Sequence, residues 1–494
     1  MNPEGIKTLG QLKKSGYTAR SVREELRSNL IDKLKSGDPI FQGIKGYEAT
    51  VIPAVERAIL AGHSILFLGL RGQAKTRMAR LMTDLLDEFV PVVDGAELND
   101  DPLDPISDQA RAIIAEHGDA TPVRWMSRTE RYSEKLATPD VSISDLIGDV
   151  DPIKAANLRL SYADQGAIHY GMIPRAHRGI FVINELPDLQ ARIQVSLFNI
   201  LQEGDIQIRG FKLLLPLDIQ FVFTANPEDY TNRGSIITPL KDRIQSQIFT
   251  HYPKDVATGM AITKQEIDLS EDQAERIIMP ALIERLVEQI AIEARVSEFV
   301  DEKSGVSARL TITAYENIIA AVERRMALNG EERGTARISD LQAAIPAIVG
   351  KIEIVYEGEQ EGAVNVANRL IASAIRTVAS EYFRGVEEKT EFKEGSVSGP
   401  IQQVVEWFEG NHVDMLSDAS EKQYERALKN VEGLNEAIRH ADEAKDGSPD
   451  LTRMEFLLHV LAGFSILDKK NIGPDIRFAD YFSSVMPGEE DYLA

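Results

Sequence analysis

The stretch from Ile65 to Leu81, ILFLGLRGQAKTRMARL, constrains the fold more than any other part of the chain. It begins with a short apolar run, passes through Gly69 and Gly72, and takes on helical spacing after the pair Lys75-Thr76. The apolar run predicts a buried strand, and the later spacing of apolar residues predicts a helix. A strand, a glycine-containing loop and a helix in this order are typical of a phosphate-binding loop.

This loop departs from the usual pattern G-x-x-x-x-G-K-[ST] at one position, where Ala74 replaces the last glycine. Alanine adds only a methyl group, and it is tolerated there if the residue has ordinary helical backbone angles. Lys75 would supply positive charge, and Thr76 would supply a hydroxyl for Mg²⁺. The alternative is a turn with no ligand. The predicted nucleotide-binding residues are Gly69, Gly72, Gln73, Ala74, Lys75 and Thr76.

A second polar site follows about a hundred residues later, in GIFVINELPDL. Asn184 and Glu185 stand at the C-terminal end of a buried apolar strand, which is where open parallel sheets present their ligands. The expected pair is Asp-Glu, with the aspartate in the Mg²⁺ shell and the glutamate polarising the attacking water. Asn184 keeps an acceptor oxygen but lacks the charge, so we expect weaker metal binding, with Glu185 as the base. The alternative is a strand that merely ends in polar residues.

The third element is FVFTANPEDY, in which Asn226 ends another buried strand. An Asn-Pro pair alone is a common loop start. Its position after the other two strands predicts a sensor residue whose amide faces the γ-phosphate and the attacking water.

Strands that alternate with helices up to about Tyr252 predict an α/β fold with a doubly wound parallel sheet. PVRWM is the expected next strand after the loop, Thr18 is the expected N-cap of a helix over residues 17–36, and IQIRGFKLLL predicts a hairpin. Beyond Tyr252 the spacing is helical. The predicted division is an N-terminal helical extension (1–40), a nucleotide-binding domain (41–252), an α-helical lid (253–384), a linker (385–400) and a helical C-terminal domain (401–494).

The composition limits which classes of molecule this protein is expected to bind. The formal net charge of -23 repels phosphate backbones and anionic lipid, so nucleic acid is disfavoured. The chain contains no cysteine, which excludes disulfides and suits a reducing cytosol. No run approaches the ~20 apolar residues that span a bilayer. We therefore expect a cytoplasmic protein without membrane insertion.

These three elements and two insertions resemble the AAA+ ATPases of the MoxR and magnesium-chelatase I-subunit group, over roughly Phe41 to Lys351. One matching insertion is DVDPIKAANLRLSYADQGAIHYG, before GIFVINE. The other is the hairpin DIQIRGFKLLLPLDIQ, before the sensor strand. The resemblance implies a P-loop AAA+ module that binds ATP and Mg²⁺ and hydrolyses ATP.

The resemblance also assigns roles to single residues. Arg243, in ITPLKDRIQSQIF, corresponds to an arginine finger that reaches the γ-phosphate of a neighbouring subunit, with Arg233 as a rival. Arg309 corresponds to the sensor-2 arginine of the lid. Ile44 and Gly46, in FQGIKGYE, correspond to the adenine side of the pocket. A surface or capping role is the alternative for each arginine.

A finger supplied in trans implies a homo-oligomeric ring, which we expect to be a hexamer. The group commonly acts with a partner that carries a von Willebrand A domain, to remodel a protein client or assist metal insertion. Arg209, Phe211 and Lys212 of the hairpin suit a grip on a polypeptide, although the hairpin could equally cover a sheet edge. The alternatives are a nucleotide-switched scaffold with little turnover, the magnesium-chelatase motor itself, and a DNA-handling relative, which the charge disfavours. The extension after about Lys389 matches no part of the AAA+ module.

Overall fold

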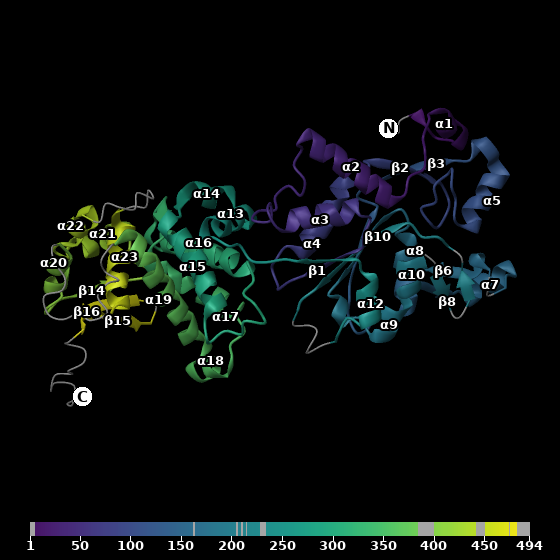
Figure 1. The fold of residues 1–494 in the computed structure, drawn as a ribbon. Helices are drawn as coiled ribbons and strands as arrows, with labels where there is room; N and C mark the ends of the chain where they lie inside the picture. The colour runs from purple at the N-terminus through teal and green to yellow at the C-terminus, as the bar shows by residue number, and fades with distance from the viewer. Residues whose placement is uncertain are drawn as a thin grey trace. The chain divides into compact units, whose positions relative to one another are not determined.

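The structure, a computed structural model, describes residues 5–161, 164–203, 206–208, 211–213, 215–227, 234–383, 400–440, 450–473 and 475–481. The chain divides into two compact units, Met1–His251 and Tyr252–Ala494, and each is described on its own (Figure 1). The finer division into an extension, a lid, a linker and a C-terminal domain stays a prediction.

The first unit is built on a five-stranded sheet in the order β11-β1-β10-β7-β4. All four neighbouring pairs are parallel. Helices connect the strands, so the predicted doubly wound parallel sheet is confirmed. The strands are β1 (Ile65–Leu68), β4 (Tyr132–Leu136), β7 (Gly179–Asn184), β10 (Ile219–Ala225) and β11 (Ser246–Phe249).

Both faces of this sheet are buried. Successive side chains of a strand point to opposite faces, and they enter two different hydrophobic clusters. Leu66 and Phe223 pack in one cluster with residues of α6, α8, α9 and α12, whereas Phe67 and Val222 pack in the other with residues of α2, α3 and α4 (Figure 1). A parallel sheet covered on both faces needs near-continuous apolar strands, which explains the runs ILFL and IFVI.

The helices of the first unit are short, and the 3₁₀ turns extend or link them. They are α1 (Leu9–Lys14), α2 (Val22–Ser36), α3 (Val51–Leu60), α4 (Lys75–Leu81), η2 (Met82–Leu85), α5 (Asp108–His117), η3 (Gly118–Ala120), α6 (Ile143–Leu146), α7 (Pro152–Leu158), η4 (Gln165–Ala167), α8 (Met172–Arg175), η5 (Leu186–Asp188), α9 (Ala191–Ser196), α10 (Phe198–Glu203) and α12 (Thr238–Arg243).

Three antiparallel pairs complete the first unit, and one of them corrects a prediction. PVRWM forms β3 (Val123–Ser127), but β3 pairs with β2 (Phe89–Val93) outside the parallel sheet. The strand that joins the sheet is β4, whose side chains are half-buried or exposed and lack an apolar run. The other pairs are β5 (Gly148–Val150) with β6 (Ile168–Tyr170), and the expected hairpin of β8 (Ile206–Ile208) with β9 (Phe211–Leu213).

The N-terminal segment is tied to the amino ends of the strands. The N-cap of α2 is Ser21, not Thr18, because Ser21 and Glu24 form a capping box. Glu25 of α2 makes a two-pronged ion pair with Arg131 at 2.6 Å, and both side chains are almost completely buried. Val22 N donates to Asp218 Oδ2 at 2.7 Å, next to the start of β10.

The second unit is mainly helical. Its elements are α13 (Val256–Glu266), α14 (Glu271–Arg276), β12 (Ile277–Ile278), α15 (Ala281–Val296), α16 (Arg309–Asn329), β13 (Gly334–Thr335), η6 (Ile338–Ala344), α17 (Ile345–Val349), α18 (Tyr356–Glu361), α19 (Ala363–Tyr382), α20 (Pro400–Trp407), β14 (His412–Met415), α21 (Glu421–Lys429), α22 (Leu434–His440), α23 (Asp450–Gly463), β15 (Leu467–Ile472) and β16 (Asp475–Asp480).

The residues after Pro400 share one hydrophobic core with the helices before them. This cluster extends from Ile277 to Phe478 and includes side chains of α15, α16, α19 and α23. A polar contact reinforces it, because the buried carboxylate of Glu455 accepts the backbone N–H groups of Ile338 and Ser339 at 2.7 and 2.9 Å. The C-terminal portion is helical as predicted, and it also contains a three-stranded antiparallel sheet, β14-β16-β15.

Among the residues that the structure describes, no helix is both long enough and apolar enough to span a bilayer.

The buried pair Glu25–Arg131 generates a stability prediction. We expect Glu25→Ala to lower the free energy of unfolding by about 3–5 kcal/mol, because it leaves the buried Arg131 charge without its carboxylate. Urea unfolding measures the change. Asp32→Ala, which removes an exposed carboxylate from the same helix, is the control and should stay within about 0.5 kcal/mol of the parent. Equal effects of the two substitutions would refute the role given to this pair.

Candidate functional site

The loop between β1 and α4 approaches its surroundings closely at Gly69. Gly69 N donates to Ala225 O at 3.2 Å. A Cβ atom at Gly69 would lie only 1.9 Å from Thr250 Oγ1 and 2.2 Å from Gln73 Oε1. Gly72 has a φ of 73°, which glycine adopts without strain. Local geometry therefore explains why both predicted loop positions are glycine: the space for a Cβ atom is missing at Gly69, and the backbone of Gly72 is left-handed.

Gln73 turns its side chain into the protein. Thr250 Oγ1 donates to Gln73 Oε1 at 2.7 Å, and Gln73 is 6% exposed. The Tyr47 hydroxyl lies 3.0 Å from Gln73 O and 2.9 Å from His251 O. Burial raises the pKa of Tyr47 to about 12, so this hydroxyl keeps its proton and donates. These contacts fix the loop at Gln73. The side chain of Gln73 therefore has a structural role.

The expected adenine-side residues lie in the same segment as Tyr47. Ile44 is partly buried against the cluster that contains Phe67. Gly46 has a φ of 80°, and its N–H donates to Glu48 Oε1 at 3.1 Å. The segment is thus joined to the loop through Tyr47, while contact of Ile44 or Gly46 with a base stays a prediction.

Ala74 requires a correction. Its φ of 54° and ψ of 18° place it in the left-handed region, so the condition of ordinary helical angles, under which alanine is tolerated, is not met. That conformation costs an alanine roughly 1–2 kcal/mol, because Cβ approaches the carbonyl oxygen. The replaced glycine therefore had a conformational task as well as a steric one, and the loop holds Ala74 in a strained state.

Lys75 and Asn226 lie together. Lys75 Nζ donates to Asn226 Oδ1 at 2.7 Å, to Leu70 O at 2.8 Å and to Gly69 O. Asn226 is 6% exposed and follows the last residue of β10. The parallel register pairs Leu68 with Ala225, so the loop after β1 and the residue after β10 start at the same level of the sheet.

Thr76 and Asn184 form the second contact between the loop and a strand end. Thr76 Oγ1 donates to Asn184 Oδ1 at 3.0 Å, and Thr224 Oγ1 donates to the same oxygen at 3.1 Å. The next residue, Glu185, is half-buried, and its backbone N–H donates to Thr224 Oγ1 at 3.1 Å. The structure therefore brings Lys75, Thr76, Asn184, Glu185 and Asn226 to one edge of the sheet.

Glu185 also has a left-handed backbone, with a φ of 56° and a ψ of 49°. Left-handed residues other than glycine cluster at functional sites, where surrounding contacts hold them in place. Leu186, which follows, is fully buried in the cluster beneath the sheet. Two strained residues, Ala74 and Glu185, thus lie in the segments that meet at this edge of the sheet.

Arg243 ends α12 and lies against α10. Its guanidinium stands 4.7 Å from the centre of the Phe198 ring. Its Nε donates to Gln202 Oε1 at 3.1 Å, and another nitrogen donates to Pro239 O at 2.7 Å. These acceptors are neutral, so they orient the guanidinium without cancelling its charge.

The remaining candidates lie either in the second unit or outside the described residues. Arg309 is the exposed first residue of α16 in the second unit, where its backbone N–H donates to Ser307 Oγ at 3.2 Å. Arg209 and Arg233 lie outside the described residues, as do the side chains of Phe211 and Lys212. Their roles stay predictions.

The sequence analysis missed three residues that hydrogen-bond to residues of the site: Tyr47, Thr224 and Thr250. A signal was available for Thr224, a lone hydroxyl within the apolar strand IQFVFTA. Tyr47 and Thr250 carried no such signal, because only the fold brings them to Gln73. In the part of the chain that the structure describes, no three or more His, Asp or Glu side chains gather to form a metal site.

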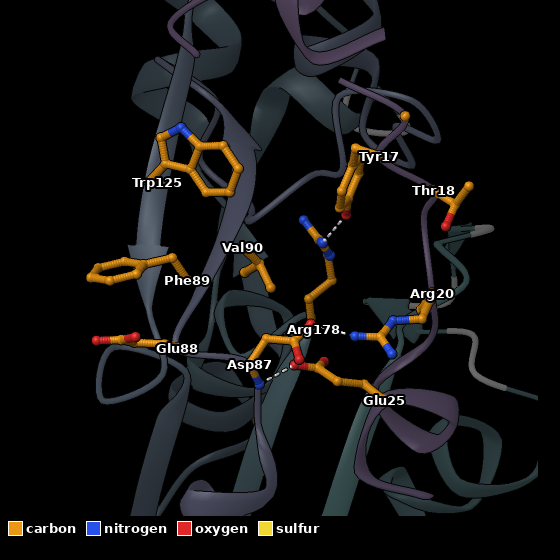
Figure 2. A pocket seen from close by; sticks show the side chains of 11 residues that line it. Tyr17, Thr18, Arg20, Glu25, Asp87, Glu88, Phe89, Val90, Trp125 and Arg178 are labelled. Atoms are coloured by element: carbon orange, nitrogen blue, oxygen red, sulfur yellow. Dashed lines mark hydrogen bonds and ion pairs between the residues drawn. The ribbon is translucent and has the colours of Figure 1, made fainter. Parts of the chain in front are cut away.

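A separate cavity of about 460 Å³ lies near Arg178, which precedes the amino end of β7. Figure 2 shows Tyr17, Arg20 and Arg178 among its lining side chains. Arg178 Nη2 donates to Tyr17 Oη at 2.9 Å and pairs with Asp101 Oδ2 at 3.0 Å, and Arg20 pairs with Asp87. Burial raises the pKa of Tyr17 well above its usual range. The cavity's buried charges are compensated internally, so we assign these contacts a structural role.

Comparison with known families gives one partial match. The model of the sigma-54 interaction domain matches residues 159–247. This stretch contains β7, β10 and α12. It therefore includes Glu185 and Asn226, which follow the ends of β7 and β10, together with Arg243.

Several solved structures are similar in part. A Cytophaga hutchinsonii protein provisionally named an ATPase is 16% identical, with 73% of this chain and 97% of that chain covered and a TM-score of 0.29. A complex of the BchI and BchD subunits of magnesium chelatase is 19% identical, with 65% of this chain and 98% of that chain covered and a TM-score of 0.33. Brucella abortus NtrX in complex with ATP is 13% identical, with 59% of this chain and 53% of that chain covered and a TM-score of 0.35. All TM-scores are below 0.5, so we infer nothing about this chain from these structures.

The sheet order, the loop and its strand-end partners define an α/β P-loop module. Together with the matched family model, they support an AAA+ ATPase, the class that the sequence predicted.

The backbone of Ala74 generates a prediction about the loop. We expect Ala74→Gly to raise the free energy of unfolding by about 1 kcal/mol, because glycine adopts the left-handed conformation without strain. Urea unfolding measures this change. The control, Ala79→Gly in the regular part of α4, should lower the same quantity by about 1 kcal/mol. If both substitutions destabilise the protein, the strain assigned to Ala74 is wrong.

Proposed function

We propose that this protein is a Mg²⁺-dependent ATPase of the MoxR and magnesium-chelatase-like group, which works as a ring-forming, chaperone-like motor. The observation that carries the proposal is the pair of contacts Lys75–Asn226 and Thr76–Asn184, which join the glycine loop to two strand ends. Ligands of open parallel sheets bind at this edge.

The side chains at this edge of the sheet fit a nucleoside triphosphate with a divalent cation. Lys75 Nζ donates to three neutral oxygens, Gly69 O, Leu70 O and Asn226 Oδ1, and a phosphate oxygen is a stronger acceptor for its charge than these. Thr76 is the residue we propose as a direct Mg²⁺ ligand, with Asn184 holding its hydroxyl. Mg²⁺ usually takes only one or two protein ligands beside phosphates and water. When bound, ATP supplies the phosphoanhydride bond and Mg²⁺ neutralises charge on it.

Glu185 is the proposed base. It follows β7 directly, and its carboxylate is half-buried at the same edge as Lys75. A carboxylate in this position polarises a water for attack on the γ-phosphate. Asn226 is the proposed sensor, because its amide already contacts the lysine that would hold the phosphates.

Assembly into a ring rests on Arg243. Its guanidinium is oriented by Phe198 and by neutral acceptors, which suits a finger offered to the phosphate of an adjacent subunit. We propose a hexamer, and Arg309 as the sensor-2 arginine of each lid. A von Willebrand A domain partner and a protein client, or metal insertion, are implied by the resemblance alone. The second candidate is a nucleotide-switched scaffold, because Asn184 lacks the charge of an aspartate.

A first experiment separates binding from hydrolysis. We expect Lys75→Ala to weaken nucleotide affinity at least about tenfold, since it removes a charge-assisted hydrogen bond worth roughly 1.5–3 kcal/mol. Isothermal titration with ATP measures the affinity. Arg80→Ala removes a charge from the same helix at an exposed site paired with Glu134, and should leave affinity within about twofold. Equal losses in both variants would point to a non-specific charge effect.

A second experiment tests the base and distinguishes the scaffold. We expect Glu185→Gln to bind ATP like the parent and to release phosphate at least about 100-fold more slowly, because the general base is lost. Phosphate release with Mg²⁺ is the measurement. If parent and variant share the same background rate, the scaffold reading replaces the ATPase.

A third experiment tests the ring. Arg243→Ala should bind ATP normally and hydrolyse it about 10³-fold or more slowly. Mixing this variant with Glu185→Gln should restore activity, because about a quarter of the interfaces in a mixed ring join an intact Glu185 to an intact Arg243. No recovery in an assembly shown by gel filtration to be mixed would refute a finger acting in trans.

A further inference from the structure

One buried hydroxyl connects the two polar residues at the end of β7. Thr224, the penultimate residue of β10, is 2% exposed. The parallel register pairs Ile183 with Phe223, so Asn184 and Thr224 follow at the same level. Thr224 Oγ1 lies 3.1 Å from Asn184 Oδ1 and 3.1 Å from Glu185 N. A single side chain thus reaches both the proposed metal-site residue and the proposed base.

The proton count at Thr224 sets the orientation of the Asn184 amide. A backbone N–H can only donate, so Thr224 Oγ1 is the acceptor toward Glu185. The single hydroxyl proton of Thr224 is then available for Asn184, and its partner must be the amide oxygen. Thr76 Oγ1 donates to the same oxygen. The Asn184 oxygen therefore faces two hydroxyls, and its NH₂ group is turned away from them.

The same hydroxyl restrains the backbone of Glu185. Glu185 adopts the left-handed conformation, which a glutamate does not favour by itself. Its N–H is held by Thr224 on one side, and the buried Leu186 anchors the chain on the other. The direction in which the Glu185 carboxylate leaves the backbone follows from these two restraints.

We propose that Thr224 is a positioning residue for hydrolysis, which sets the Asn184 amide and the Glu185 carboxylate through one hydroxyl. The proposal rests on the proposed ATPase function and deepens it. Thr224 does not contact Lys75 or the loop main chain in any described hydrogen bond, so its removal should affect turnover and leave nucleotide binding intact.

The test compares Thr224→Val, which keeps the shape and loses the hydroxyl, with Thr224→Ser, which keeps the hydroxyl. In Thr224→Val we expect kcat to fall at least about tenfold while the dissociation constant for ATP stays within about twofold, because binding depends on Lys75 and the loop. Thr224→Ser should stay within about threefold of the parent in both.

A second readout does not depend on activity. In the nucleotide-free protein, the Glu185 amide should exchange with deuterium slowly in the parent and in Thr224→Ser, and faster in Thr224→Val, which has lost the acceptor. Thr250→Val is a matched control. Thr250 follows the last residue of β11, and its hydroxyl donates to Gln73. This variant should weaken ATP binding and leave the Glu185 exchange unchanged.

Each outcome decides the proposal. A hydrolysing parent with a Thr224→Val variant of equal kcat overturns the positioning role of Thr224 and leaves the ATPase intact. A parent that binds ATP and never hydrolyses it overturns the proposed function and this proposal together. If the Thr224→Val variant does not fold, Thr224→Ala removes the same hydroxyl without adding volume. A parent-like kcat in Thr224→Ala also overturns the proposal.

Discussion

The polar residues of the candidate site lie where three central strands of the parallel sheet end, because apolar clusters cover both faces of these strands. β1, β10 and β7 have strand neighbours on both sides, and apolar clusters cover both faces. A polar group on such a strand finds a partner or solvent only where the strand ends. Parallel pairing brings these ends to one edge, so Lys75, Asn184 and Asn226 meet although long stretches of chain separate them.

Two of the six non-glycine residues with a positive φ in the described part of the chain lie at this edge. Ala74 and Glu185 both adopt the left-handed conformation, at a cost of roughly 1–2 kcal/mol each. Buried neighbours and hydrogen bonds maintain these conformations: Tyr47 holds the loop at Gln73, and Thr224 holds Glu185. Polar groups fixed before the ligand arrives need no reorganisation during the reaction, which is how preorganised sites stabilise a transition state.

The parts of the chain outside the AAA+ resemblance are built into the two units. In the first unit, Glu25 of the N-terminal segment neutralises the buried Arg131. In the second unit, Glu455 accepts the first N–H groups of η6, and Tyr424 donates to the same carboxylate at 2.9 Å. Buried charged groups of this kind are stable only with their partners, so these segments are structural components of each unit.

The sequence by itself determined the features that depend on neighbouring residues: the apolar runs of β1, β7 and β10, the glycine loop, and the polar residues that end each strand. It did not determine β4, because an edge strand with half-buried side chains needs no apolar run. The backbone of Ala74 and the role of Tyr47 were decided by the tertiary structure alone. For Thr224 the sequence shows a lone hydroxyl in an apolar strand, but only the tertiary structure gives it its partners. Tyr47 meets His251 across 204 positions and Thr224 meets Asn184 across 40, and such contacts form only when the sheet brings distant segments together, which no local pattern encodes.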